Sequence, residues 1–375
     1  MSLNTIQRTL GFAFVGASLL LTQPVRAMAD EDQQDNSFVY VMTNQATDNT
    51  VLVFQRNADG SLKEVQEVST HGLGTGGSGD PLGSQGALRL ASEGRLLLAI
   101  NAGSNEVSSL AVSEGGLQFV SKAPSGGTQP VSVTGRGDTA YVLNAGGTPN
   151  VTAFRIGLNG QLTMIPNSMV ALPGGANCSP AQVGITPDSE VLVVTEKNTN
   201  QIDLFPIDDA GQLSAPSSVP SNGATPFGFA FGQDQTLIVS EATASTFSSY
   251  HIRSANNALT LQTITKSLPD LGAAACWIVT DRRGRLAFTT NSGTSTISSL
   301  TVSAEGTLQL LAAVAASTGS GSAPIDLALT HRGDFLYALS TSNGTLTGFR
   351  VQNGGLSQVA SLTGLPLSIQ GIAAR

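Results

Sequence analysis

The stretch Val191-Leu-Val-Val-Thr-Glu196, followed after a short polar turn by Gln201-Ile-Asp-Leu-Phe205, is one copy of a pattern that runs along the chain. A short apolar, β-branched run ends in Asn, Glu or Ser, and a second, alternating run ends near a Gly that a Leu follows. Alternation with a period of two residues is typical of β-strands. Six further copies begin at Phe38, Leu96, Ala140, Leu237, Leu286 and Phe335.

The copies recur about every 49 residues, close to the periods of blade-forming repeats. One more short run, opening on a small residue or a proline, precedes each copy after the first. These runs are Gly86–Leu90, Pro130–Val133, Pro180–Ile185, Pro226–Phe229, Cys276–Thr280 and Pro324–Leu329. With the Leu-bearing final run this makes four strands per copy, and four-stranded sheets repeated radially are the blades of a β-propeller.

The two ends of the chain complement each other. The first copy lacks its opening strand, because the chain enters directly at Phe38, whereas Leu365–Ala373 has the character of an opening strand. We therefore predict an all-β, seven-bladed propeller over residues 38–375, closed by pairing of the N- and C-terminal strands, with Ile372 alongside Tyr40. A sandwich or an open solenoid would leave sheet edges uncovered.

Composition excludes several classes of partner. The 375 residues are 12% charged and carry a net charge of −8, whereas a nucleic-acid binder needs a basic stripe. The three histidines share no ligand spacing, so we expect no metal and no cofactor.

Cys178 and Cys276 fall in blades that are second neighbours, and we expect free thiols. The expected partner of this monomer is a small-molecule lactone or organic acid.

The first 29 residues have the features of a secretory signal. Arg8 precedes an apolar stretch from Leu10 to Leu21 that is too short to span a bilayer, and small residues follow up to Ala29. An uncleaved anchor is the alternative. Residues 30–37 are expected to be a flexible lead-in, and no later stretch is apolar enough to span a membrane. We expect a periplasmic or extracellular protein.

The residue that ends the second strand of each copy is the first candidate for chemistry. In an antiparallel sheet this end lies beside the start of the opening strand, so these residues share one face of the propeller. Most copies place Asn or Ser there, but two adjacent copies place Glu196 and Glu241. Glu241, helped by Glu196, could act as a general base on water. Alternatively, each Glu accepts hydrogen bonds from the turn that follows it, as Asn does.

Further candidates for substrate binding lie in or near the opening strands. They are Arg89, Gln129, Gln182, Trp277 and Asp326. Alternation lets only about half of them face the channel. The Gly-rich loop 70–85 interrupts the repeat on the same face as the glutamates, and His71 with Asp80 could lie over the channel mouth. No Lys-Ser or Lys-Thr follows it, so it is not a phosphate loop; a flexible surface excursion is the alternative.

Segments such as Thr186-Pro-Asp188, Val193-Val-Thr-Glu-Lys-Asn198 and Asp209-Ala-Gly-Gln-Leu213 resemble the seven-bladed lactonase propeller family. That family includes propeller-type 6-phosphogluconolactonases and carboxymuconate lactonising enzymes, and the resemblance covers the chain from Phe38. It implies a site containing a blade-five glutamate, which Glu241 matches. The family's His and Arg at two strand starts are replaced by Ala181 and Phe227. A Phe cannot bind phosphate as a guanidinium does, so phosphogluconate lactone is disfavoured as the substrate.

Two functions from different classes remain open. The first is an exported, metal-independent lactonase-like enzyme that hydrolyses or cyclises a lactone or small organic acid at the channel mouth. In it Arg89, Gln182 or backbone N–H groups would stabilise the oxyanion. The second is a non-catalytic secreted propeller that binds a peptide, a glycan or an envelope component. The fold alone does not decide between them.

Overall fold

The computed structural model describes residues 37–255 and 258–375. The predicted signal segment, and the lead-in up to residue 36, lie outside the described residues. Within the described part the regular structure consists of β-strands and three short 3-10 turns, η1 (Ser92–Gly94), η2 (Gly175–Asn177) and η3 (Gln233–Gln235).

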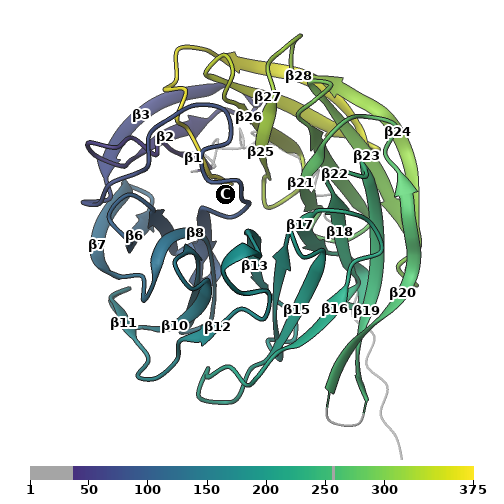
Figure 1. Cartoon of the computed structure of the whole chain (residues 1–375). Coiled ribbons are helices and arrows are strands. Elements are labelled where there is room, and N and C mark those ends of the chain that lie inside the picture. Colours follow the sequence, from purple (N-terminus) through teal and green to yellow (C-terminus); the bar gives the residue numbers. More distant parts are fainter. Residues whose placement is uncertain (1–36, 256–257) are drawn as a thin grey trace, which may run out of the picture. The chain divides into compact units, whose positions relative to one another are not determined.

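Seven antiparallel sheets surround a central axis, and the C-terminus lies close to it (Figure 1). From the inner strand outward the sheets, here called blades 1 to 7, are the following. Blade 1 is β29 (Ile372–Ala374), β1 (Phe38–Met42), β2 (Thr50–Arg56) and β3 (Leu62–Ser69); blade 2 is β4 (Leu88–Ala91), β5 (Leu96–Asn101), β6 (Glu106–Ser113) and β7 (Gly116–Pro124); blade 3 is β8 (Thr128–Arg136), β9 (Thr139–Gly146), β10 (Asn150–Ile156), β11 (Leu162–Met164) and β12 (Val170–Ala171). Blade 4 is β13 (Pro180–Ile185), β14 (Val191–Glu196), β15 (Gln201–Pro206) and β16 (Ser217–Pro220); blade 5 is β17 (Pro226–Phe231), β18 (Leu237–Glu241), β19 (Thr246–Ala255) and β20 (Ala258–Pro269). Blade 6 is β21 (Ala275–Thr280), β22 (Leu286–Asn291), β23 (Thr296–Val302) and β24 (Leu308–Ser317); blade 7 is β25 (Pro324–Leu329), β26 (Phe335–Ser340), β27 (Thr345–Gln352) and β28 (Gly355–Leu362).

The two ends of the chain meet in blade 1. Strand β29 pairs antiparallel with β1, with Tyr40 opposite Ala373 and Val41 opposite Ile372. The predicted seven-bladed propeller, closed by the N- and C-terminal strands, is confirmed. The predicted pairing of Ile372 with Tyr40 is wrong by one residue, because Ala373 lies opposite Tyr40.

The structure departs from the predicted strands in two places. The outer strand of blade 3 is divided into β11 and β12, because Pro166 lacks an amide donor and Asn167 has φ 57°. The C-terminal strand covers only Ile372–Ala374, because the chain turns at Pro366, whose carbonyl accepts a hydrogen bond from the Ile369 N–H. Both changes shorten a strand and leave the order of strands intact.

The blades pack face to face through the second strands, which are the most deeply buried: every residue of β5, β14 and β26 is buried. Blades 7 and 1 also meet through the Tyr337 hydroxyl, which donates to the Gly60 carbonyl at 2.8 Å. Gly60 has φ 92°, and a Cβ there would lie 2.3 Å from the Phe335 ring. This turn therefore requires glycine for both its conformation and the close approach of the next blade.

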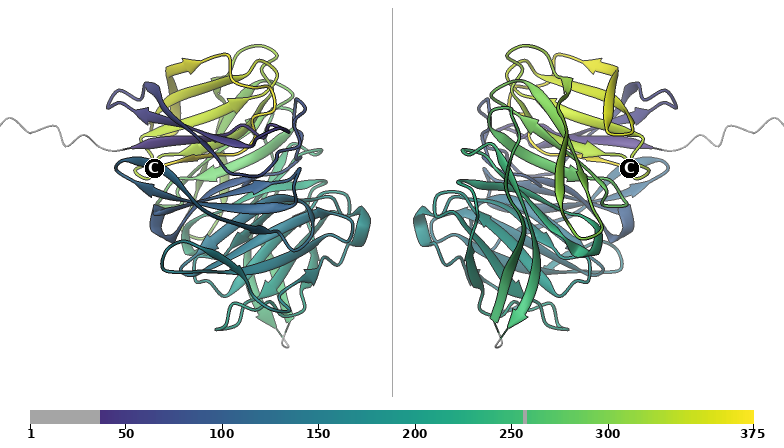
Figure 2. Two further views of the ribbon diagram at one scale, coloured as in Figure 1. Left: turned by 90° about the vertical axis from the view of Figure 1, so that its left-hand side faces the viewer. Right: turned by 90° about the vertical axis from the view of Figure 1, so that its right-hand side faces the viewer.

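The strands of each sheet run between the two faces of the propeller (Figure 2). We call the face where the inner strands begin the start face and the opposite one the end face. Because adjacent strands are antiparallel, the second strands end on the start face: Glu196 is paired with Pro180, and Glu241 with Pro226. The two glutamates therefore lie on one face, as predicted from the repeat.

Candidate functional site

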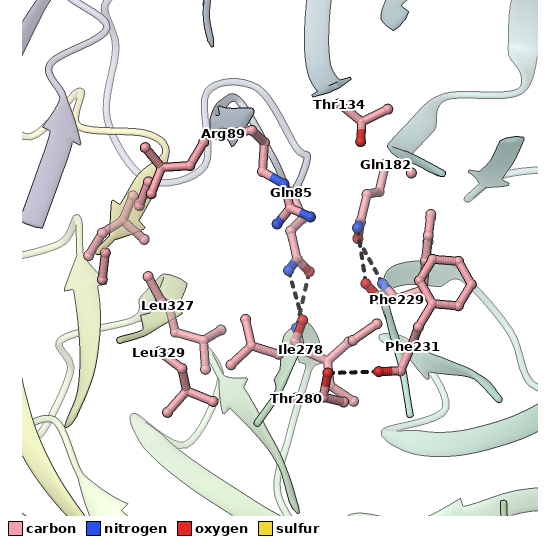
Figure 3. A pocket seen from close by; sticks show the side chains of 18 of the residues that line it. Gln85, Arg89, Thr134, Gln182, Phe229, Phe231, Ile278, Thr280, Leu327 and Leu329 are labelled. Carbon is pink, nitrogen blue, oxygen red and sulfur yellow. Dashed lines mark hydrogen bonds between the residues drawn. The ribbon is translucent and has the colours of Figure 1, made fainter. Parts of the chain in front are cut away.

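A cavity of about 400 Å³ occupies the end-face half of the central channel (Figure 3). Its walls come from the second halves of the inner strands, so every blade contributes. Among the lining residues are Arg89, Thr134, Gln182, Phe231, Thr280, Leu329 and Ala374. Innermost strands have one unpaired edge, and this edge supplies backbone N–H and C=O groups to the cavity.

Arg89 is the only charged side chain among the residues that line this cavity. Its guanidinium has no hydrogen-bond acceptor or ion-pair partner within the described part of the chain; its recorded interaction is electrostatic, with Asp326. Burial lowers the pKa of Arg89, although an arginine remains protonated at neutral pH. The cavity therefore contains one cation whose donors are not used by the protein.

Asp326 lies on the inner strand of blade 7 with 3% of its surface exposed. Burial raises its pKa to about 8, while the Leu327 N–H, which donates to its Oδ1 at 2.9 Å, and Arg89 act in the opposite direction. Burial thus favours the neutral form of the Asp326 carboxyl, which weakens its compensation of the positive charge of Arg89. Asp326 does not itself line the cavity.

The two glutamines of the cavity use their amides to connect strands (Figure 3). Gln85 crosses the channel from blade 2 to blade 6, where its Nε2 donates to the Ile278 carbonyl at 2.8 Å and its Oε1 accepts from the Ile278 N–H at 3.1 Å. Gln182 makes the equivalent pair with Phe229, at 3.0 and 2.7 Å. These amides hold the inner strands in position, and their hydrogen bonds to the backbone compete with any bond to a ligand.

Glu241 lies on the start face with no exposed surface. Its carboxylate accepts hydrogen bonds from the Gly223 N–H at 2.7 Å, Ser248 at 2.7 Å, Ser221 at 3.1 Å and Thr246. Gly223 and Ser221 belong to the linker that enters blade 5. The predicted catalytic role of Glu241 stays a prediction, and these contacts favour the structural alternative.

Glu196 has the same position in blade 4 and is also fully buried. It accepts from the Gly174 N–H at 3.0 Å and from Thr199, so it fastens the linker that enters its own blade. Its neighbour Asp203 has a pKa raised to about 8, first by burial and further by Glu196. Burial therefore favours the protonated form of Asp203.

Asparagines do the same work in other blades. The Asn101 Oδ1 accepts from Thr70 at 2.7 Å, and the Asn144 Nδ2 donates to the Ser125 carbonyl at 3.1 Å. Thr70 and Ser125 lie in the linkers that enter blades 2 and 3. The end of the second strand is thus a recurrent fastening point, and Glu is one of the residue types that serves it.

The other predicted residues do not reach the cavity. Trp277 is buried, with its Nε1 donating to the Ser84 carbonyl at 2.9 Å and its ring 4.8 Å from that of Phe227. Gln129 is exposed, and its backbone N–H donates to Asn105. His71 is exposed and packs against Phe119 of β7, with ring centroids 4.3 Å apart. Of the predicted substrate-binding residues, the structure brings Arg89 and Gln182 into one cavity, with Asp326 next to it.

Sequence reasoning missed Lys197 and Gln85. Lys197 follows Glu196, and its Nζ lies 5.2 Å from the centre of the Phe227 ring, on the start face. It donates to the Gly83 carbonyl, and burial lowers its pKa while Asp80 counteracts this effect. A lysine directly after the patterned Glu, with an acid in the Gly-rich loop, was the available signal.

The part of the chain that the structure describes contains neither a metal-binding cluster nor a membrane-spanning helix. No group of three or more His, Cys, Asp or Glu side chains there could hold a metal ion. Across residues 37–255 and 258–375, no helix is long and apolar enough to cross a membrane. Cys178 and Cys276 are buried free thiols.

Comparison with known proteins identifies a family and several solved structures with the same fold. A family model for lactonases with a seven-bladed β-propeller matches residues 31–173 and 136–269. No curated protein matches the sequence.

Solved structures share the fold at low sequence identity. The periplasmic gluconolactonase of Pseudomonas aeruginosa is 17% identical, with a TM-score of 0.68 over 89% of this chain and 98% of that one. A Bacteroides uniformis protein proposed to be a 6-phosphogluconolactonase is 16% identical, with a TM-score of 0.69 over 89% and 99%. A protein of unknown function from Desulfotomaculum acetoxidans is 15% identical, with a TM-score of 0.70 over 90% and 98%.

Proposed function

Because this chain belongs to the lactonase family of seven-bladed β-propellers, we propose that it hydrolyses a small lactone in the central cavity, with Arg89 as the catalytic residue. The observation that carries the proposal is the unused guanidinium of Arg89 in a cavity of about 400 Å³. A group whose donors are free can bind substrate at once, whereas Glu241 would first have to leave its present partners.

The chemistry follows from the position of the cation. The lactone carbonyl oxygen accepts hydrogen bonds from the guanidinium, which polarises the carbonyl. Water then adds to the carbonyl carbon, and Arg89 stabilises the oxyanion that forms. Collapse of this intermediate breaks the ring C–O bond, and the alkoxide takes the proton that the added water gives up. The product is a hydroxy acid whose carboxyl loses its proton to solvent.

No carboxylate is among the lining residues, so the proposal rests on electrophilic assistance. Asp326 acts as a positioning residue, because its charge state sets the field in which the guanidinium lies. Preorganised donors in a site with limited water are worth more than the same donors in bulk solvent.

The test is a hydrolysis assay of purified residues 30–375 against a panel of neutral and acidic lactones. We expect Arg89→Gln to lower kcat/KM by about 100-fold, the usual cost of losing an oxyanion donor. The matched control is Arg95→Gln in the same blade, whose side chain is 73% exposed and whose loss is expected to leave the rate unchanged.

Glu241→Gln in the same assay separates the two candidate sites. We expect the activity per folded molecule to be retained. A loss of activity in this variant, with an unchanged melting temperature, would assign the chemistry to the glutamates instead. If no lactone is hydrolysed by the wild-type protein, the lactonase proposal fails and the non-catalytic binding protein is favoured.

We also propose that the protein is exported. The support is the sequence of residues 1–29, with Arg8 before a short apolar stretch and small residues up to Ala29. Expression of the full chain, followed by cell fractionation and mass spectrometry of the mature N-terminus, tests this. A cut after Ala27 or Ala29 in an extracytoplasmic fraction supports export, and a cytoplasmic, full-length protein contradicts it.

A further inference from the structure

Residues 80–85, here called the plug, cross the start-face half of the channel. Its Ser84 and Gln85 are almost completely buried, at 0 and 2% exposed. The Ser84 hydroxyl donates to the Val131 carbonyl at 2.8 Å, and the Gln85 N–H donates to the Ala181 carbonyl at 3.0 Å. With the bonds to Trp277 and Ile278, the plug is attached to blades 3, 4 and 6.

The other end of the plug is held by hydrogen bonds of Asp80 and by its electrostatic interaction with Lys197. Asp80 accepts from the Gly83 N–H at 2.9 Å and from the Gln370 Nε2 at 3.1 Å. Lys197 donates to the Gly83 carbonyl and interacts electrostatically with Asp80. The plug is thus an ordered part of the propeller, and His71, at the other end of the Gly-rich loop, takes no part in it.

The plug and the cavity share Gln85, which is the last residue of the plug and also lines the cavity. The plug therefore forms the floor of the cavity on the start-face side. The remaining lining residues come from the second halves of the inner strands, so the mouth lies on the end face. The amide of Gln85 is used by Ile278, which leaves the guanidinium of Arg89 as the charged recognition group.

We propose that the cavity is a binding site for a small carboxylate, entered from the end face only, in which Arg89 binds the carboxylate and the plug closes the start face. A guanidinium matches a carboxylate with two parallel hydrogen bonds. This inference rests on the proposed function, since the opening of a lactone produces a hydroxy acid. It adds that the product binds the residue that activated the substrate, so the product inhibits the enzyme.

The first experiment measures binding rather than turnover. D-Gluconate is titrated calorimetrically into the protein, with D-glucitol as the control that has the same hydroxylated chain and no carboxylate. We expect gluconate to bind and glucitol to bind at least about tenfold more weakly. Arg89→Gln should weaken gluconate binding at least about tenfold, and Arg89→Lys should give an intermediate affinity because it keeps the charge without the fork.

The second experiment tests the entry route. Leu329 lines the cavity on the end face, whereas Leu367 is 48% exposed in the linker that approaches the plug. Leu329→Cys and Leu367→Cys are each labelled with a bulky maleimide; the native thiols are buried. Labelling at position 329 should abolish gluconate binding, and labelling at position 367 should leave it unchanged.

Three outcomes overturn the inference: gluconate and glucitol bind alike, Arg89→Gln binds gluconate as wild type does while keeping its melting temperature, or labelling at position 367 blocks binding and labelling at position 329 does not. Failure of the proposed function looks different. In that case gluconate binds through Arg89 from the end face, yet no lactone is hydrolysed.

Discussion

The two halves of the channel differ in how their polar groups are used. The start-face half contains the charged residues Glu196, Glu241, Asp80 and Lys197. Their side chains form hydrogen bonds with the linkers and with the plug. In the end-face half, a single guanidinium lines the cavity without an acceptor from the described protein.

In this structure the charges that the repeat pattern predicts are hydrogen-bonded, whereas the unused donors lie in the other half of the channel. A buried carboxylate needs partners to be stable, so a carboxylate at a regular repeat position is compatible with a purely structural role. A cation that lines a cavity and has no hydrogen-bond acceptor from the protein must be solvated by water or bound by a ligand. The following predictions sharpen or break this contrast, in order of expected effect.

Glu241→Leu is expected to lower the free energy of unfolding by about 3 kcal/mol or more, because the Gly223 N–H and three hydroxyl groups lose their acceptor in a buried site. Urea denaturation measures this. The control is Glu190→Leu, an exposed residue before β14, with an expected change within about 0.5 kcal/mol. Equal stability of both variants would show that Glu241 does not fasten its linker.

Gln85→Ala and Gln182→Ala are each expected to lose about 2 kcal/mol of stability, since each leaves a backbone N–H and a carbonyl of an inner strand of another blade without a partner. Only Gln85→Ala should also speed the reaction of Cys276 with a thiol reagent, because Gln85 belongs to the plug and Cys276 lies near Asp80 and Lys197. Similar labelling rates in the two variants would argue against the plug as a barrier.

Asp326 makes stability depend on pH. Its pKa is raised to about 8 in the folded protein from an ordinary value of 3.8. Between these values the folded state holds a proton that the unfolded state lacks, so stability falls as pH rises, by up to about 1.4 kcal/mol per pH unit, and levels off above about pH 8. Asp203 contributes in the same direction.

Asp326→Asn removes the carboxyl group whose protonation in the folded state contributes to this pH dependence. We expect the decrease in the free energy of unfolding between pH 6 and pH 8 to be smaller in this variant than in wild type, as measured by urea denaturation at several pH values. Parallel pH profiles for the two proteins would show that Asp326 ionises normally in the folded state.

His71→Ala is expected to have the smallest effect, about 0.5 kcal/mol or less, because the imidazole is exposed and packs edge-on against the Phe119 ring. Lactone hydrolysis should be unchanged. A large loss of activity in this variant would place the N-terminal part of the Gly-rich loop at the functional site and break the contrast between the two halves.

Much of the fold could be predicted because a propeller is a local pattern repeated. Alternation within Val191–Glu196 specifies a buried strand, and the missing opening strand before Phe38 specifies the closure with the tail. The turn at Pro166 and the turn after Pro366 were harder, since proline signals a break without saying whether the strand resumes.

The site was less predictable. Arg89 and Gln182 could be placed near the channel from their strands. The sequence does not indicate that the Gln182 amide is hydrogen-bonded to the Phe229 backbone, or that Arg89 has no acceptor in the described part of the chain. The plug joins residues 193 positions apart, Gln85 and Ile278, and no spacing rule relates them.

The sequence by itself determined the number of blades, the closure of the ring and the face on which the glutamates lie, because these depend on periodicity and strand direction. Only the tertiary structure decided which polar groups are satisfied, which end of the channel is closed and where one cation remains available. The reason is physical: hydrogen-bond satisfaction depends on angles and distances of a few ångström between side chains from different blades, which the linear pattern does not encode.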